Sequence, residues 1–131
     1  MKQLDIDNWY KCKIDKKVYK QLTKRSDYQG LKHVFTWLFF LFLSGYLACI
    51  SWGTWWAVPA FLIYGNIFMA CNPVWHECGH RTAFKTRWLN ELFYHVGSFM
   101  YNFEPIRWRW SHFHHHSYTL HTNPYDYEIQ V

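Results

Sequence analysis

Residues 34–75 read VFTWLFFLFLSGYLACISWGTWWAVPAFLIYGNIFMACNPVW and contain no Lys, Arg, Asp or Glu. The hydrocarbon core of a bilayer is about 30 Å thick, and a helix needs about 20 apolar residues to cross it. The stretch is therefore long enough for two crossings. Gly53 lies between the polar residues Ser51 and Thr54 and can adopt turn conformations, so we predict spans at residues 34–52 and 55–75.

All charged residues lie outside this stretch. Residues 1–33 carry nine basic and four acidic side chains, and residues 76–131 carry five of each. A soluble chain of 131 residues could hardly cover two helices that are apolar on every side. The sequence therefore predicts an integral membrane hairpin, with a basic segment before it and a histidine-bearing segment after it.

The charge distribution also predicts an orientation. Both flanks of the hairpin are basic and the turn is uncharged, so the positive-inside rule places both termini in the cytosol. Charge next to a membrane explains the basic N-terminal segment, so we expect membrane lipid and no nucleic acid as a partner. The aromatic content of 23% excludes a disordered chain. Five tryptophans fall near the ends of the predicted spans, where indole rings favour the headgroup layer: Trp37, Trp52, Trp55, Trp56 and Trp75.

The first histidine cluster begins where the second span ends, with the sequence HECGH at residues 76–80. If the helix continues, His76 and His80 are one turn apart and point from one face, so both imidazoles can reach one ion. Pro73 is expected to bend the chain as it leaves the bilayer. Cys78 lies between the two histidines, and we interpret it as a small buried residue and not as a ligand.

The second cluster is HFHHH at residues 112–116. In a helix His112, His115 and His116 share a face, whereas His114 points away. The two clusters together offer five imidazole nitrogens, a donor type that suits iron, zinc, copper or nickel. A zinc site needs only three or four protein ligands, so five donors indicate more than one metal or a higher coordination number. The predicted metal ligands are His76, His80, His112, His115 and His116.

The segment between the clusters is predicted to return the chain to the end of the second span. Residues 92–103 are uncharged but too short to cross a bilayer, which indicates an interfacial helix. We expect His33 to flank the membrane and His95 to pack in this helix. His121 is a candidate additional ligand or a donor to a ligand.

The two clusters, in this order after a hairpin, resemble the membrane fatty acid desaturase and hydroxylase superfamily. The HxxxH box of that family corresponds to His76 and His80, and its HxxHH box to His112, His115 and His116. The stretches HECGHRTAFKTRWLNE and WRWSHFHHHSYT look most like bacterial fatty acid desaturases.

The resemblance implies an all-α, four-span fold with a histidine-ligated di-iron centre, of which this chain is the N-terminal portion. The family has a second hairpin and a third histidine box, neither of which is present before Val131, so we expect a fragment or truncated product that is inactive alone. The implied activity is oxygen-dependent desaturation of an acyl lipid, with dioxygen as co-substrate and electrons from a ferredoxin or a b-type cytochrome.

Three alternatives remain open. A lipid hydroxylase of the same superfamily would have the same ligands. HECGH also fits the HExxH motif of a membrane zinc protease, with His76 and His80 as ligands and Glu77 as the base. In the desaturase interpretation Glu77 instead orients an imidazole. Finally, the 131-residue chain could be a membrane fragment without catalytic activity.

Overall fold

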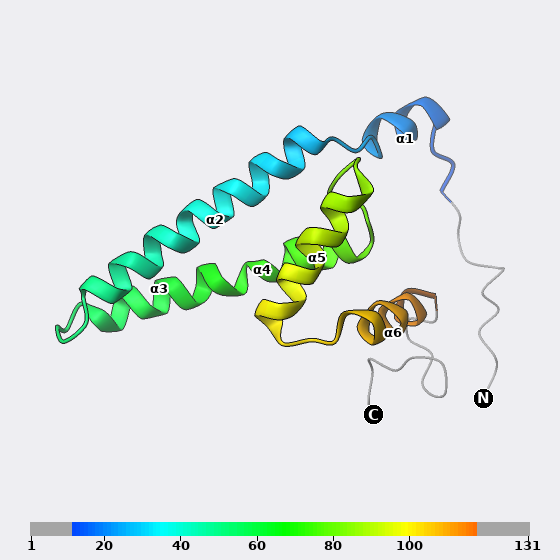
Figure 1. Cartoon of the computed structure of the whole chain (residues 1–131). Helices are drawn as coiled ribbons and strands as arrows, with labels where there is room; N and C mark the ends of the chain where they lie inside the picture. The colour runs from blue at the N-terminus through cyan, green and yellow to red at the C-terminus, as the bar shows by residue number, and fades with distance from the viewer. Residues whose placement is uncertain (1–11, 118–131) are drawn as a thin grey trace.

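The computed structural model describes residues 12–117, and over these residues it contains helices and no strands. The helices are α1 (Lys16–Leu22), α2 (Asp27–Ile50), α3 (Ala57–Met69), α4 (Cys71–Gly79), α5 (Arg87–Tyr101) and α6 (Pro105–Ser117). Figure 1 shows α2 running antiparallel to α3, with α5 crossing α4 and α6 lying at the end away from the hairpin turn. The predicted all-α fold is confirmed.

The turn of the hairpin lies where the sequence predicts it, between α2 and α3. Gly53 has a φ of 81°, a left-handed conformation that costs glycine little. The hydroxyl of Ser51 donates to the carbonyl of Ala48 over 2.9 Å, and that of Thr54 donates to the carbonyl of Ser51 over 2.7 Å. These bonds satisfy polar groups where the helical pattern stops.

The first hairpin helix begins before the uncharged stretch. Ser26 is the N-cap of α2, and its hydroxyl accepts a hydrogen bond from the backbone N–H of Gln29. Asp27 follows in the first turn, where a carboxylate interacts favourably with the helix dipole. These two residues set the start of the helix, whereas the lack of charge marks only its apolar part.

The second predicted span is interrupted. α3 ends at Met69, Ala70 joins the two helices, and α4 begins at Cys71. Pro73 has no N–H to donate to the carbonyl of Met69, so the helical hydrogen bonding cannot continue unbroken here. The predicted bend at Pro73 therefore takes the form of a break three residues before it.

The hairpin leaves most of its apolar side chains uncovered. Two helical stretches, Lys16–Ile50 and Ala57–Gly79, are apolar and long enough to cross a membrane, and only 28% and 11% of their most apolar windows are buried. The core helix of a soluble protein is mostly buried, so these fractions fit helices that face lipid. The uncharged residues 34–75 form the apolar part of both stretches.

The tryptophans divide into two groups. Trp52, Trp55 and Trp56 at the hairpin turn are exposed, as expected of residues in the headgroup layer. Trp37 and Trp75 are buried instead, because each indole N–H has a partner inside the protein. Trp37 donates to the carbonyl of Ile67 over 2.9 Å, and Trp75 donates to the hydroxyl of Ser98 over 2.8 Å.

The core of the protein draws its buried residues from α2, α4 and α5 and from the loop before α5, and the contact between α4 and α5 is the most extensive. A Cβ atom added to Gly97 of α5 would lie 2.6 Å from Cβ of Trp75, so glycine is what lets the two helices approach closely here. The Trp75 ring stacks parallel to those of Tyr94 and Tyr101. This packing fixes the end of α4, where the first histidine cluster lies.

Candidate metal centre

The first two histidines lie at the end of α4. His76 is in the last turn, and His80 is the C-cap residue. The backbone N–H of His80 donates to the carbonyl of His76 over 3.1 Å, so the helical path continues through His80. The two side chains therefore share a face, with ring centroids 4.6 Å apart.

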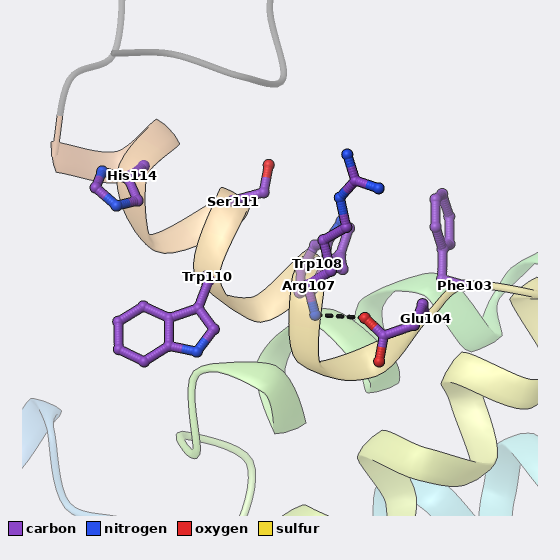
Figure 2. A pocket seen from close by; sticks show the side chains of 7 residues that line it. All are labelled: Phe103, Glu104, Arg107, Trp108, Trp110, Ser111 and His114. Atoms are coloured by element: carbon purple, nitrogen blue, oxygen red, sulfur yellow. Dashed lines mark hydrogen bonds between the residues drawn. The ribbon is translucent and has the colours of Figure 1, made fainter.

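The second pair lies on α6. The helix begins with Pro105, and the Glu104 carboxylate before it accepts hydrogen bonds from the backbone N–H groups of Ile106 and Arg107, the second of which is drawn in Figure 2. This is the common combination of proline in the first turn and an acidic cap. His112 and His116 are one turn apart, with ring centroids separated by 4.5 Å.

The two pairs meet because α5 reverses the chain direction between them. The ligand nitrogens of His76, His80, His112 and His116 all lie within 4.8 Å of one another. Nε2 of His112 is the centre of the group. It lies 2.8 Å from Nε2 of His76, 3.1 Å from that of His80 and 2.9 Å from that of His116.

This spacing is suited to a shared cation. An imidazole nitrogen carries either one hydrogen or one lone pair, so hydrogen bonds alone do not account for three close nitrogen neighbours. Two nitrogens about 2.1 Å from one metal are about 3.0 Å apart if they subtend a right angle, and about 3.4 Å apart in a tetrahedron. The three separations measured from His112, 2.8–3.1 Å, are of the size expected for nitrogens gathered around one cation.

The surroundings of His80 favour its neutral imidazole, the form that binds metal. Burial lowers the pKa of His80, and the adjacent His76, His112 and His116 lower it further. His112 is buried, His76 is half-buried and the other two are exposed. The group is therefore reached from the protein surface. Cys78, between the first two histidines, is fully buried in the core and is not part of the group.

Two neighbours hold the imidazoles in place. Oε1 of Glu77 lies 3.5 Å from Nδ1 of His76, and Oε2 of Glu77 accepts a hydrogen bond from the Thr82 hydroxyl over 2.6 Å. Trp108 stacks on His112 with ring centroids 4.3 Å apart and an interplanar angle of 14°. Trp108 was not among the residues that the sequence predicts for the site, although its position one turn before His112 places it on the same helix face.

The other histidines lie outside the group of four. The ring of His115 is 5.8 Å from that of His112, but its nitrogens are not among the four that converge. His114 lines a hollow on the outer side of α6 with Trp110 and Ser111, as Figure 2 shows. His33 lines a small separate cavity with Glu77.

Two further histidines complete the set. His95 is exposed on α5, with its ring edge-on to that of the adjacent Tyr94, so the packing role expected for it stays a prediction. His121, the candidate additional ligand, lies outside the described residues.

Comparison with known proteins supplies context for this geometry. The chain is 38% identical over 80 residues to an sn-1 oleoyl-lipid 12-desaturase of Synechocystis, a match that covers 60% of this chain and 22% of that protein. It is 37% identical over 67 residues to an sn-1 acyl-lipid omega-3 desaturase (ferredoxin) of Nostoc, covering 50% of this chain and 19% of that protein. The chain thus spans about a fifth of the length of these relatives. No solved structure was found to match it.

The matched relatives are cyanobacterial, in agreement with the bacterial resemblance of the histidine boxes. Together with the two apolar helices, they indicate a membrane protein. The fatty acid desaturase family model matches residues 53–130, more than half of the chain and a range that contains both histidine pairs. The chain therefore belongs to the fatty acid desaturase family.

Proposed function

We propose that this chain carries two histidine boxes of an oxygen-dependent acyl-lipid desaturase and binds iron through His76, His80, His112 and His116. The observation that carries the proposal is the convergence of four imidazole nitrogens, from two segments far apart in the sequence, in a member of the desaturase family. Iron bound there would supply the activation of dioxygen and the removal of hydrogen from an unactivated methylene group.

Membership of the family supports iron over zinc. Imidazole nitrogens suit iron as well as zinc, and the fatty acid desaturase family to which the chain belongs is what favours iron here. Four nitrogens within 4.8 Å of one another suffice for one ion. A second iron would need His115 and further ligands, so we propose His115 as the fifth histidine of a di-iron centre.

The position of the group supports a lipid substrate. Within the described residues every Lys, Arg, Asp and Glu lies outside residues 34–75, and therefore at the same end of the hairpin as the histidines. An acyl chain can reach this end from the bilayer, while electrons arrive from the aqueous side. We propose that this is the cytosolic side of a bacterial inner membrane. We also propose a ferredoxin as the donor, the protein named for the Nostoc relative, with a b-type cytochrome as the alternative.

The geometry gives less support to a zinc protease. In that mechanism Glu77 has to face a water molecule on the metal. Its carboxylate lies instead beside Nδ1 of His76, whereas Nε2 of that ring points to the other histidines, and it also accepts a hydrogen bond from Thr82. This position suits orientation of the His76 ring.

Metal binding tests the proposal directly. Anaerobic titration of the full chain in lipid nanodiscs with Fe²⁺ is expected to show stoichiometric binding. His112→Ala should weaken the affinity at least 100-fold, because His112 is the centre of the group, whereas His33→Ala should leave it unchanged. Failure of the wild-type chain to bind Fe²⁺, or equal affinities of the two variants, would contradict the proposal.

The reaction is tested separately in membranes. The chain is expressed with a ferredoxin, and the membrane acyl chains are analysed by gas chromatography. New double bonds would show that this chain suffices for desaturation. Hydroxylated chains would favour the hydroxylase. Stoichiometric zinc, with a proteolytic activity that Glu77→Gln abolishes, would favour the protease.

A further inference from the structure

A carboxylate on α5 joins the two segments that carry the histidines. Oε1 of Glu91 accepts a hydrogen bond from Nε of Arg81 over 2.7 Å, and Oε2 accepts one from Nη1 of Arg109 over 3.0 Å. Arg81 directly follows His80, and Arg109 lies one turn before His112. Each arginine is therefore attached through a short stretch of backbone to one histidine pair.

The backbone of Arg81 is unusual. Its φ is 60°, and it follows the C-cap of α4 in a Schellman motif, with its N–H bonded to the carbonyl of Cys78 and that of Thr82 bonded to the carbonyl of Glu77. Glycine is the usual residue at this left-handed position, because a Cβ atom strains it. An arginine here is explained by what its side chain does, and the side chain bonds to Glu91.

The same motif recurs at the end of α5 without this feature. Asn102 has a φ of 56°, its N–H bonds to the carbonyl of Phe99, and that of Phe103 bonds to the carbonyl of Ser98. Asparagine tolerates the left-handed conformation better than other non-glycine residues. The two helix ends thus share a backbone geometry, but only the one beside His80 places an arginine there.

Arg109 depends on Glu91 for its hydrogen bonding. Its guanidinium carbon lies 4.1 Å from the centroid of the Tyr94 ring, and Nη1 bonds to Glu91. Nε and Nη2 of Arg109 are buried without a hydrogen-bond partner among the described residues. Loss of the Glu91 carboxylate would leave a partly buried cation without its counter-ion, an arrangement that favours movement of α6.

We infer that Arg81, Glu91 and Arg109 form an ionic clamp that sets the separation of the two histidine pairs, with Glu91 as a positioning residue for the metal. The inference rests on the proposed metal site. The clamp touches none of the four converging nitrogens, so it acts through the backbone of the segments that carry them. Its loss should therefore change the geometry of metal binding more than the helical content.

The test uses Co²⁺ as a probe with the full chain in nanodiscs, because its visible absorption band reports coordination geometry as well as affinity. Glu91→Gln is expected to weaken Co²⁺ binding at least tenfold and to alter the band, while circular dichroism stays unchanged. Asp27→Asn removes a carboxylate that bonds to Thr86, away from the histidines, and should leave the binding and the band as they are.

Arg81→Gly separates positioning from stability. It relieves the left-handed backbone, so the variant should unfold at the same temperature as the wild type or higher, yet bind Co²⁺ at least tenfold more weakly. Asn102→Gly gives the matched relief at the end of α5 and should bind Co²⁺ normally. If Glu91→Gln does not fold, Arg81→Gly decides the question.

The outcomes distinguish the two proposals. A wild-type chain that binds no Co²⁺ and no Fe²⁺ would overturn the proposed metal site and the clamp with it. A wild-type chain that binds Co²⁺, together with Arg81→Gly and Glu91→Gln within twofold of its affinity and with its band, would overturn the clamp alone.

Discussion

The hairpin of α2 and α3 and the histidine-bearing half of α4–α6 are built on different principles. In the hairpin, α3 has no buried residue, and exposed apolar side chains such as Phe42 and Leu62 point outward. In the other half, polar side chains are buried and hydrogen-bonded, among them Asn90 and Ser98 of α5. Lipid can cover the first surface, whereas the second depends on particular partners inside the protein.

The difference indicates how substitutions act. On the exposed face of the hairpin any apolar side chain of suitable size serves, so only a change in polarity should have a large effect there. In the histidine-bearing half buried side chains such as Asn90 and Ser98 have defined hydrogen-bond partners, so even changes of similar volume should destabilise it. Four substitutions test this contrast, the first three of them with a matched control variant.

A charge on the outer face of α2 should have the largest effect. Phe42→Lys should raise the free energy of membrane insertion by about 3 kcal/mol, because Lys is strongly disfavoured at the centre of a membrane helix. The measurement is the fraction of chain that resists alkaline extraction from membranes. Tyr28 is on the same helix before the uncharged stretch, and its 73% exposure matches the 72% of Phe42, so Tyr28→Lys should have little effect. Equal extraction of the two variants would contradict a lipid-facing hairpin.

Removal of a buried amide should come next. The side chain of Asn90 accepts from the N–H of Phe84 and donates to the carbonyls of Phe84 and Thr86. Asn90→Leu should lower the free energy of unfolding by about 2–3 kcal/mol, because the buried backbone N–H of Phe84 loses its hydrogen-bond acceptor. Chemical unfolding in detergent, followed by circular dichroism, measures the change. Asn66→Leu on the exposed face of α3 is the control, and a loss of similar size there would remove the contrast.

Glycine substitutions should change stability by a smaller amount, and with opposite signs in the two halves. Gly97→Ala places a methyl group 2.6 Å from Cβ of Trp75 and should destabilise the protein by about 1–2 kcal/mol. At Gly65 of α3 an added Cβ atom would meet nothing within 4 Å beyond its chain neighbours and the backbone of its own helix, so Gly65→Ala should stabilise its helix by up to about 1 kcal/mol. Thermal unfolding of both variants checks whether the signs are opposite.

The smallest expected effect is a dependence on pH at the start of α2. Hydrogen bonds from the backbone N–H and the hydroxyl of Thr86 hold the pKa of Asp27 below its ordinary value of 3.8. A lowered carboxyl pKa adds stability above the ordinary pKa, and this stability is lost as the pH falls through the folded value. Asp27→Asn should therefore be less sensitive to acid than the wild type below about pH 4. Identical unfolding profiles between pH 5 and pH 2 would show that the contact contributes nothing.

Sequence patterns predict the hairpin well because its determinants are local. The uncharged stretch is one continuous run of sequence, and Gly53 and the spacing of His76 and His80 each act over a few residues. Ser26 and Asp27 would also have indicated the true start of α2, since a capping residue followed by an acid is a local signal.

Long-range contacts could not be predicted in this way. Burial of Trp37 and Trp75 depends on partners in other helices, as does the bonding of Glu91 to two arginines. Viewed down the axis of α6, the side chains of His115 and His116 lie on opposite sides of that of His112, since each residue turns a helix by about 100°. The sequence does not say from which side α4 approaches, and the structure has it on the side of His116.

The break at Ala70 has a mechanical consequence. Membrane helices tilt when the thickness of the bilayer changes, and an unbroken helix would carry that tilt to its last turn. Here α4 packs chiefly against α5 and is joined to α3 at Ala70, where the α-helical hydrogen bonding is broken ahead of Pro73, so we expect α4 to keep its direction when α3 tilts. The histidine pair at its end would then hold its geometry in membranes of different lipid composition.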